Sequence, residues 1–132
     1  MKKVILIMVV SLFMTACANF AAPAGDSGGS YRQIGMDEAI AIMSEQSGYI
    51  ILDVRRADEF AAGHIPGAIN IANESIGTEE IPELPDKDQL ILVYCRSGNR
   101  SKQASQKLVA LGYTNIVEFG GIIDWPGEVV TE

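Results

Sequence analysis

Apolar and polar positions along this chain follow two periods, and each period predicts a different kind of element. The nearly continuous apolar runs at 49–54 and 89–94 are typical of strands that are buried on both faces, and 115–119 predicts one further strand. Apolar residues recur at helical spacing over 36–46 and 101–111. Strands that alternate with helices indicate the α/β class, with a parallel sheet covered on both faces.

Shorter segments complete this pattern. They predict strands at 31–34 and 68–71, a helical turn at 57–62, a loop with at most one helical turn over 73–88 and, opened by Gly120-Gly121, a final helix that carries Trp125. The two longer helices should pack on the sheet through apolar stripes. These stripes consist of Ala39, Ile40 and Met43 in the first helix, and of Ala104, Leu108 and Leu111 in the second.

Length and charge limit the possible functions. The chain has 132 residues, enough for one domain with one core. Its net charge of −7 excludes the basic surface that nucleic-acid binding requires. An acidic protein is also repelled by anionic lipid, so any attachment to a membrane has to come from acyl chains.

The first 16 residues have the pattern of a signal peptide. Lys2-Lys3 supplies the positive start, and the apolar region 4–14 is too short to span a bilayer. The segment Met14-Thr15-Ala16-Cys17 resembles a bacterial lipobox, which implies that Cys17 becomes the lipidated first residue. The alternative is an ordinary secretory signal followed by a chance cysteine.

Residues 17–30 are predicted to form a flexible tether, because Ala, Gly, Ser and Pro dominate them. Such a tether reaches about 20 Å and leaves 31–132 as the folded domain. We therefore expect a lipid-anchored protein of the bacterial envelope, on the periplasmic face or the extracytoplasmic face of the cell membrane. Ala18 is not the aspartate that retains many lipoproteins at the inner membrane, so the resemblance favours an outer membrane where one exists.

Cys95 lies where the apolar run 89–94 passes into the helix predicted at 101–111. Ligands of open α/β sheets bind at the carboxyl ends of the strands, where loop amides and a helix N-terminus form a cradle for anions. Such a cradle stabilises a thiolate, and Arg96 and Arg100 add positive charge that would attract an anionic substrate. The sequence therefore predicts a nucleophilic cysteine; the alternative is a buried structural one.

Four motifs resemble the rhodanese-like sulfurtransferases over about residues 31 to 128. They are CRSGNRS at 95–101, LDVR at 52–55 followed by Asp58-Glu59-Phe60, GHIPGAINI at 63–71, and Gly120-Gly121 followed by Trp125. The resemblance implies a small α/β domain with a central parallel sheet of about five strands. It also implies that a small anionic sulfur donor such as thiosulfate passes sulfane sulfur to Cys95. A thiol or cyanide would then remove the sulfur from the cysteine persulfide.

The loop after Cys95 is expected to bind the donor. Its residues are Arg96, Ser97, Gly98, Asn99 and Arg100. This chemistry needs no cofactor and no metal, and we expect a monomer. If Cys17 carries lipid, Cys95 is the only free thiol of the mature domain, which excludes a thioredoxin-like dithiol cycle within one chain.

Three other polar residues are expected to have structural roles. Asp53 should hydrogen-bond loop amides, and Arg55 should pair with Asp58 or Glu59. The alternative is that Asp53 and Arg55 bind substrate or tune Cys95. His64 is the single histidine, and the resemblance places it in a packed turn, neither as a catalytic base nor as a metal ligand.

Two other functions remain as alternatives. The cell-cycle dual-specificity phosphatases share the rhodanese fold but have an arginine six positions after the cysteine, where this chain has Ser101. Arg100 comes five positions after Cys95, and the shorter loop suits a sulfur atom better than a phosphoryl group, which disfavours a phosphatase or arsenate reductase. The other alternative is a non-enzymatic module that binds a partner or senses sulfane sulfur.

Overall fold

The structure is a computed structural model that describes residues 30–131. Its strands are β1 (Arg32–Gln33), β2 (Ile50–Asp53), β3 (Ile69–Asn70), β4 (Ile91–Cys95) and β5 (Ile116–Gly121). Its helices are α1 (Met36–Glu45), α2 (Ala57–Ala62) and α3 (Asn99–Ala110), with 3-10 turns η1 (Asn73–Ser75) and η2 (Ile122–Asp124). Strands and helices alternate along the chain, which confirms the predicted α/β class.

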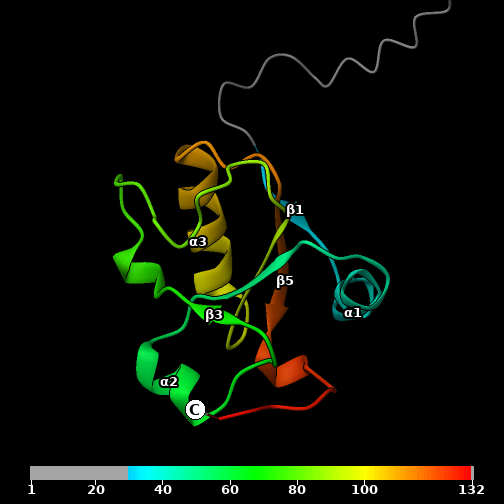
Figure 1. Cartoon of the computed structure of the whole chain (residues 1–132). Coiled ribbons are helices and arrows are strands. Elements are labelled where there is room, and N and C mark those ends of the chain that lie inside the picture. The colour runs from blue at the N-terminus through cyan, green and yellow to red at the C-terminus, as the bar shows by residue number, and fades with distance from the viewer. Residues whose placement is uncertain (1–29, 132) are drawn as a thin grey trace, which may run out of the picture.

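The five strands form one parallel sheet in the order β1-β5-β4-β2-β3 (Figure 1). β4 lies at the centre, where Val93 is paired with Leu52 of β2 and with Glu118 of β5. The predicted parallel sheet of about five strands is therefore confirmed. The carboxyl end of β4 is flanked by strands on both sides, so Cys95 occupies the middle of the edge where ligands of such sheets bind.

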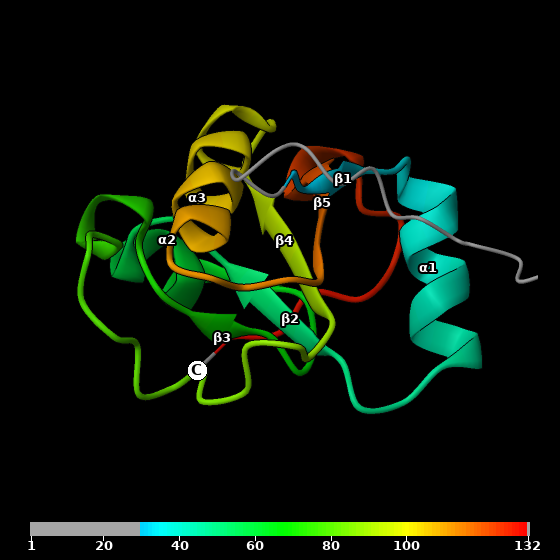
Figure 2. The same cartoon turned by 90° about the horizontal axis from the view of Figure 1, so that it is seen from above.

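Helices cover both faces of the sheet, with α3 and α1 on opposite sides (Figure 2). All of β4 is buried, and its side chains alternate between the faces as a strand requires. Val93 and Cys95 pack with Leu108 of α3, whereas Leu92 and Tyr94 pack in the cluster that contains α1 and α2. The Cys95 side chain therefore lies on the α3 face.

Two predicted boundaries beside the site are wrong. Helix α3 begins at Asn99, two residues earlier than predicted, because Gly98 adopts a positive φ of 114° and turns the chain into the helix. Strand β5 continues through Gly121, which pairs with Cys95 after an irregularity in the ladder. The predicted final helix is only the short turn η2, and Trp125 follows it.

The predicted helical stripes are correct in part. In α1 the buried residues are Ala39 and Ile42, and Ile42 was not part of the predicted stripe. The other two predicted residues, Ile40 and Met43, are half-buried. In α3 both Ala104 and Leu108 are buried as expected, and Leu111, just after the helix, is half-buried.

The predicted signal peptide, Cys17 and residues 18–29 lie outside the described residues. Among residues 30–131, no helix has the length and apolar character that crossing a membrane requires.

Candidate active site

Cys95 is the last residue of β4, and its side chain is covered by the start of α3. The residue is only 1% exposed. The backbone N–H of Gly98 donates a hydrogen bond to Cys95 Sγ over 3.0 Å. A donor at this distance stabilises the thiolate more than the thiol, and the N-terminus of α3 acts in the same sense. The amide of Gly98 and the start of α3 thus both lie at the sulfur, where the sequence led us to expect a loop amide and a helix N-terminus.

The loop 96–98 rests directly on β5, and glycine at position 121 makes this contact possible. A Cβ atom on Gly121 would lie 1.9 Å from the carbonyl oxygen of Arg96 and 2.5 Å from the backbone nitrogen of Ser97. The same carbonyl accepts a hydrogen bond from the backbone N–H of Ile123 over 3.3 Å. The position of the loop is thus determined by the last strand of the domain.

Ser101 and Glu118 lie behind the thiol, and neither was predicted to belong to the site. Ser101 Oγ lies 3.4 Å from Cys95 Sγ and 2.6 Å from Glu118 Oε1. Both residues are buried. The only signal in the sequence was a carboxylate in the middle of an otherwise apolar strand, Ile116–Phe119.

The predicted substrate-binding residues comprise the loop 96–98 and the first two residues of α3. Arg96, Ser97 and Asn99 are exposed, whereas Gly98 is buried beside the thiol. The guanidinium of Arg100 is bound to the carboxylate of Glu59 through two hydrogen bonds of 2.6 and 3.0 Å. Of the two cations expected beside Cys95, Arg96 is therefore exposed and Arg100 is neutralised by a partner on α2.

This ion pair shifts the titration of both partners. Hydrogen bonding to Arg100 lowers the pKa of Glu59 to about 2, against the opposing effect of partial burial. The hydrogen bonds from Glu59 in turn raise the pKa of Arg100. The pair is consequently charged on both sides at any pH at which an enzyme assay would be run.

We expect Glu59→Gln to lower stability by about 1 kcal/mol at neutral pH, which is about 5 °C in thermal midpoint. Because the pKa of Glu59 in the fold lies below its usual 4.5, the pair contributes fully above about pH 4.5. Its contribution is lost as the pH falls toward 2. The midpoints of the two proteins, measured against pH, should therefore converge in acid.

Asp58→Asn is the matched control, because Asp58 pairs with Arg56 at an exposed position. Its thermal midpoint should stay close to that of the parent chain. A constant difference between Glu59→Gln and the parent down to the lowest pH would contradict the expectation for Glu59.

Asp53, the last residue of β2, and Arg55 form a buried ion pair. Arg55 donates to both carboxylate oxygens of Asp53, at 2.6 to 3.0 Å, and to the carbonyl oxygen of Gly63 at 2.7 Å. Burial opposes the charge of the guanidinium, but the hydrogen bonds and charge of Asp53 outweigh it and raise the pKa of Arg55. The predicted pairing of Arg55 with Asp58 or Glu59 is wrong; Arg56 is the residue that pairs with Asp58.

This pair supports the fold around the site. Arg55 lies 5.8 Å from the ring centre of Tyr94, whose side chain belongs to the face of the sheet opposite Cys95. Asp53 also accepts a hydrogen bond from the backbone N–H of Arg55. This is the bond to a loop amide that was expected of Asp53. The geometry thus matches a structural role and places neither side chain at the sulfur.

His64 lies in a packed turn. Its ring stacks on Phe60 with 3.8 Å between ring centres, and its Nδ1 lies 2.9 Å from the carbonyl oxygen of Phe60. Its backbone exchanges two hydrogen bonds of 2.9 Å with Val130. In the part of the chain that the structure describes, no group of three His, Cys, Asp or Glu side chains is placed to hold a metal ion.

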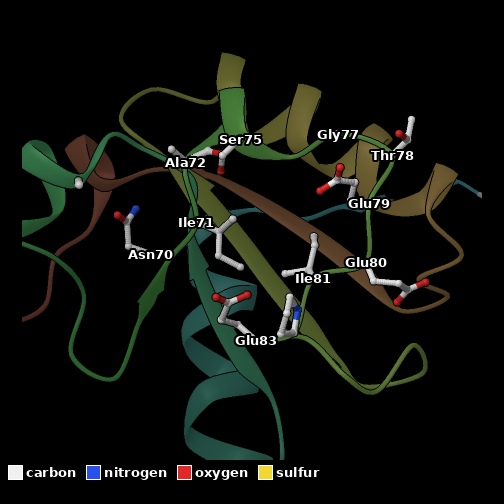
Figure 3. A pocket seen from close by; sticks show the side chains of 12 residues that line it. Asn70, Ile71, Ala72, Ser75, Gly77, Thr78, Glu79, Glu80, Ile81 and Glu83 are labelled. Carbon is white, nitrogen blue, oxygen red and sulfur yellow. The ribbon is translucent and has the colours of Figure 1, made fainter.

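A pocket of about 610 Å³ lies beside strand β3. Figure 3 shows Asn70, the last residue of β3, and Ile71, which follows the strand, together with the segment 77–83. Glu79, Glu80 and Glu83 contribute carboxylates to this lining. None of residues 95–100 lines the pocket. The negative charge of the pocket does not suit an anionic donor.

The chain belongs to the rhodanese family, because the model of the rhodanese-like domain matches residues 36–127. It is similar to the thiosulfate sulfurtransferase GlpE of Pseudomonas entomophila, with 34% identity over 103 residues, which cover 74% of this chain and 91% of that protein.

Two solved structures have the same fold. A rhodanese-related protein from Thermoplasma volcanium superposes with a TM-score of 0.64 and 31% identity, covering 77% of this chain and all of that one. A rhodanese from E. coli, solved with anions, has a TM-score of 0.58 and 34% identity, covering 64% of this chain and 99% of that one.

Some relatives are much longer. The match to the adenylyltransferase and sulfurtransferase UBA4 of Candida albicans, at 32% identity over 96 residues, covers 67% of this chain but only 22% of that protein.

Proposed function

We propose that this protein is a sulfurtransferase in which Cys95 carries the transferred sulfur as a persulfide. The observation that carries the proposal is the position of Cys95 Sγ, at the end of the central strand and 3.0 Å from the amide nitrogen of Gly98 at the start of α3. The name of the similar Pseudomonas protein, thiosulfate sulfurtransferase, supports this reaction class. The E. coli rhodanese solved with anions supports an anionic donor.

The reaction proceeds in two displacements. The Cys95 thiolate attacks the outer sulfur of thiosulfate, a new S–S bond forms, and the old S–S bond breaks so that its electron pair leaves with sulfite. In the second step cyanide or a thiolate attacks the outer sulfur of the cysteine persulfide. The Cys95 thiolate leaves, and the product is thiocyanate or a new persulfide. The Gly98 amide can donate to the negative charge on sulfur before and after each step.

Mass spectrometry of the purified protein after addition of thiosulfate tests this mechanism. We expect Cys95 to gain the mass of one sulfur atom and to lose it when cyanide is added. Continuous formation of thiocyanate would identify an enzyme. A stable adduct that turns over only once would favour the persulfide carrier or sensor, and absence of any adduct would contradict sulfur transfer.

We also propose that the protein is a lipid-anchored monomer of the bacterial envelope, attached through Cys17. The support is the sequence pattern of residues 1–17 and the small, polar composition of the predicted tether. The anchor would hold the domain about 20 Å or less from the membrane surface.

We expect Cys17→Ser, made in the full chain, to release the protein from membranes and to leave sulfur transfer unchanged. The reason is that an acyl chain provides the attachment, while the domain at 31–132 provides the chemistry. Membrane fractionation with an activity assay on each fraction measures both effects. A variant that stays in the membrane fraction would contradict lipidation, and loss of activity by residues 31–132 alone would contradict the domain boundary.

A further inference from the structure

Glu118 is a carboxylate in the interior of the domain, and the reaction described above gives it no role. It is 3% exposed and lies in β5 between Val117 and Phe119, which pack in the core cluster that contains α1 and α2. The alternation of side chains along a strand directs Glu118 to the other face, toward α3 and Cys95. Burial of a carboxylate is unfavourable unless hydrogen bonds or a counter-charge compensate it.

Hydrogen bonds, and not a cation, compensate this carboxylate. Glu118 Oε1 accepts from Ser101 Oγ at 2.6 Å and from the backbone N–H of Gly120 at 2.9 Å. Within residues 30–131, no Lys, Arg or His side chain lies within ion-pair distance of Glu118. A cation would neutralise the carboxylate permanently, whereas a hydroxyl partner leaves it able to accept a proton.

Ser101 connects this carboxylate to the thiol. Its Oγ lies 3.4 Å from Cys95 Sγ, 2.9 Å from the carbonyl oxygen of Gly98 and 3.4 Å from that of Gly120. A serine hydroxyl has one hydrogen to donate and two lone pairs that accept. When its hydrogen points to the carboxylate at 2.6 Å, the strongest of these acceptors, a lone pair remains for the S–H group of Cys95.

We propose that Ser101 and Glu118 form a proton path that removes the proton from the Cys95 thiol. The S–H proton moves to Ser101 Oγ while the hydroxyl proton of Ser101 moves to Glu118 Oε1. One S–H bond and one O–H bond break, two O–H bonds form, and nothing is oxidised or reduced. The products are the Cys95 thiolate, an unchanged serine and a protonated Glu118. The inference rests on the proposed function, since only a nucleophilic cysteine needs this activation.

Charge balance favours this path. The thiol and carboxylate together carry one negative charge before the transfer and one after it, so two anions never lie side by side in the buried site. The groups of other elements near the thiol are Ser101 of α3 and Glu118 of β5. The guanidinium of Arg100 is bound to Glu59 of α2, and the charge of Glu74 in η1 also acts on it. Arg96 of the loop is exposed. Thus the Gly98 amide favours the thiolate, and Glu118 accepts the proton of the thiol.

Glu118→Gln tests the path, because the glutamine has the same size and its amide oxygen can accept from Ser101 and Gly120, but it cannot take the proton. The readout is the rate of alkylation of Cys95 by iodoacetamide, which is neutral and needs no sulfur donor, followed as a function of pH. We expect the variant to react about a hundredfold more slowly near neutral pH. At strongly alkaline pH, where hydroxide can take the proton directly, it should approach the parent rate.

The opposite result near neutral pH would overturn the proposal. If Glu118 acts only as a negative charge beside sulfur, its removal should stabilise the thiolate and make alkylation faster. A purely structural role would lower the thermal midpoint and slow the reaction equally at every pH. Ser101→Ala should reproduce the defect of Glu118→Gln, and the double variant should be no slower than either, because both remove one path.

Glu38→Gln is the matched control, since it removes the same charge from an exposed position on α1. Its pH profile should equal that of the parent chain. The experiment also separates this inference from the proposed function. A pH-dependent defect in alkylation without any thiosulfate chemistry would support the path and contradict the sulfurtransferase, whereas normal alkylation with active sulfur transfer would contradict the path alone.

Discussion

Replacement of Cys95 by serine is expected to reduce thiosulfate:cyanide sulfur transfer to the background rate while the fold is retained. A serine hydroxyl keeps its proton far more strongly than a thiol does, and oxygen cannot hold the transferred sulfur as a stable persulfide. The side chain lies in a space bounded by Gly98 and Ser101, both of which can hydrogen-bond a hydroxyl. The thermal midpoint should therefore change by less than about 4 °C.

Thiocyanate formation and thermal unfolding of the same preparation measure the two effects. Cys17→Ser serves as the control, because it removes the other cysteine of the chain and should leave transfer intact. Residual transfer above background in Cys95→Ser would contradict the covalent mechanism. A large fall in midpoint would show that Cys95 has a structural role instead.

Among residues without a reactive side chain, Gly121 should be the one whose replacement by alanine lowers stability and sulfur transfer the most. The new methyl group would lie 1.9 Å from the carbonyl oxygen and 2.3 Å from the carbonyl carbon of Arg96, both backbone atoms that no rotamer change can move away. Either β5 separates from β4 or the loop moves away from the start of α3. We expect a loss of about 3 kcal/mol or more, or at least 12 °C in midpoint.

Sulfur transfer should fall together with stability in this variant, since the loop carries the amide that donates to Cys95 Sγ. Gly77→Ala is the control, because a Cβ atom at Gly77 meets nothing within 4 Å and its φ is not positive. It should change the midpoint by less than about 3 °C. Parent-like stability and transfer in Gly121→Ala would show that the loop tolerates displacement from β5.

The pattern of apolar residues was sufficient to predict most elements, because an element that is buried on one face or on both has apolar residues at a regular spacing. β4 is buried on both faces and is therefore apolar throughout, and α2 was predicted with the bounds that it has. The boundaries at Asn99 and Gly121 could not be predicted in this way. Each depends on a glycine next to the loop, and a glycine that extends a strand looks in sequence like one that ends it.

The thiol and its loop were predictable because they are contiguous in the chain. The partners of the loop were not, because they come from distant segments. Arg100 is neutralised by Glu59, 41 residues away, and Ser101 meets Glu118, 17 residues away. Only the register of the parallel sheet places Glu118 beside the thiol, and register is not visible in one strand's composition.

The dependence of the loop on β5 also has a consequence for the order of events in synthesis. Glu118, Gly120 and Gly121 follow Cys95 by more than 20 residues, with the whole of α3 between them. A chain that has been synthesised only to the end of α3 contains the cysteine but neither the carboxylate behind it nor the strand on which its loop rests. Such a nascent chain therefore holds Cys95 without its partners from β5, and the complete site forms only when the last strand has joined the sheet.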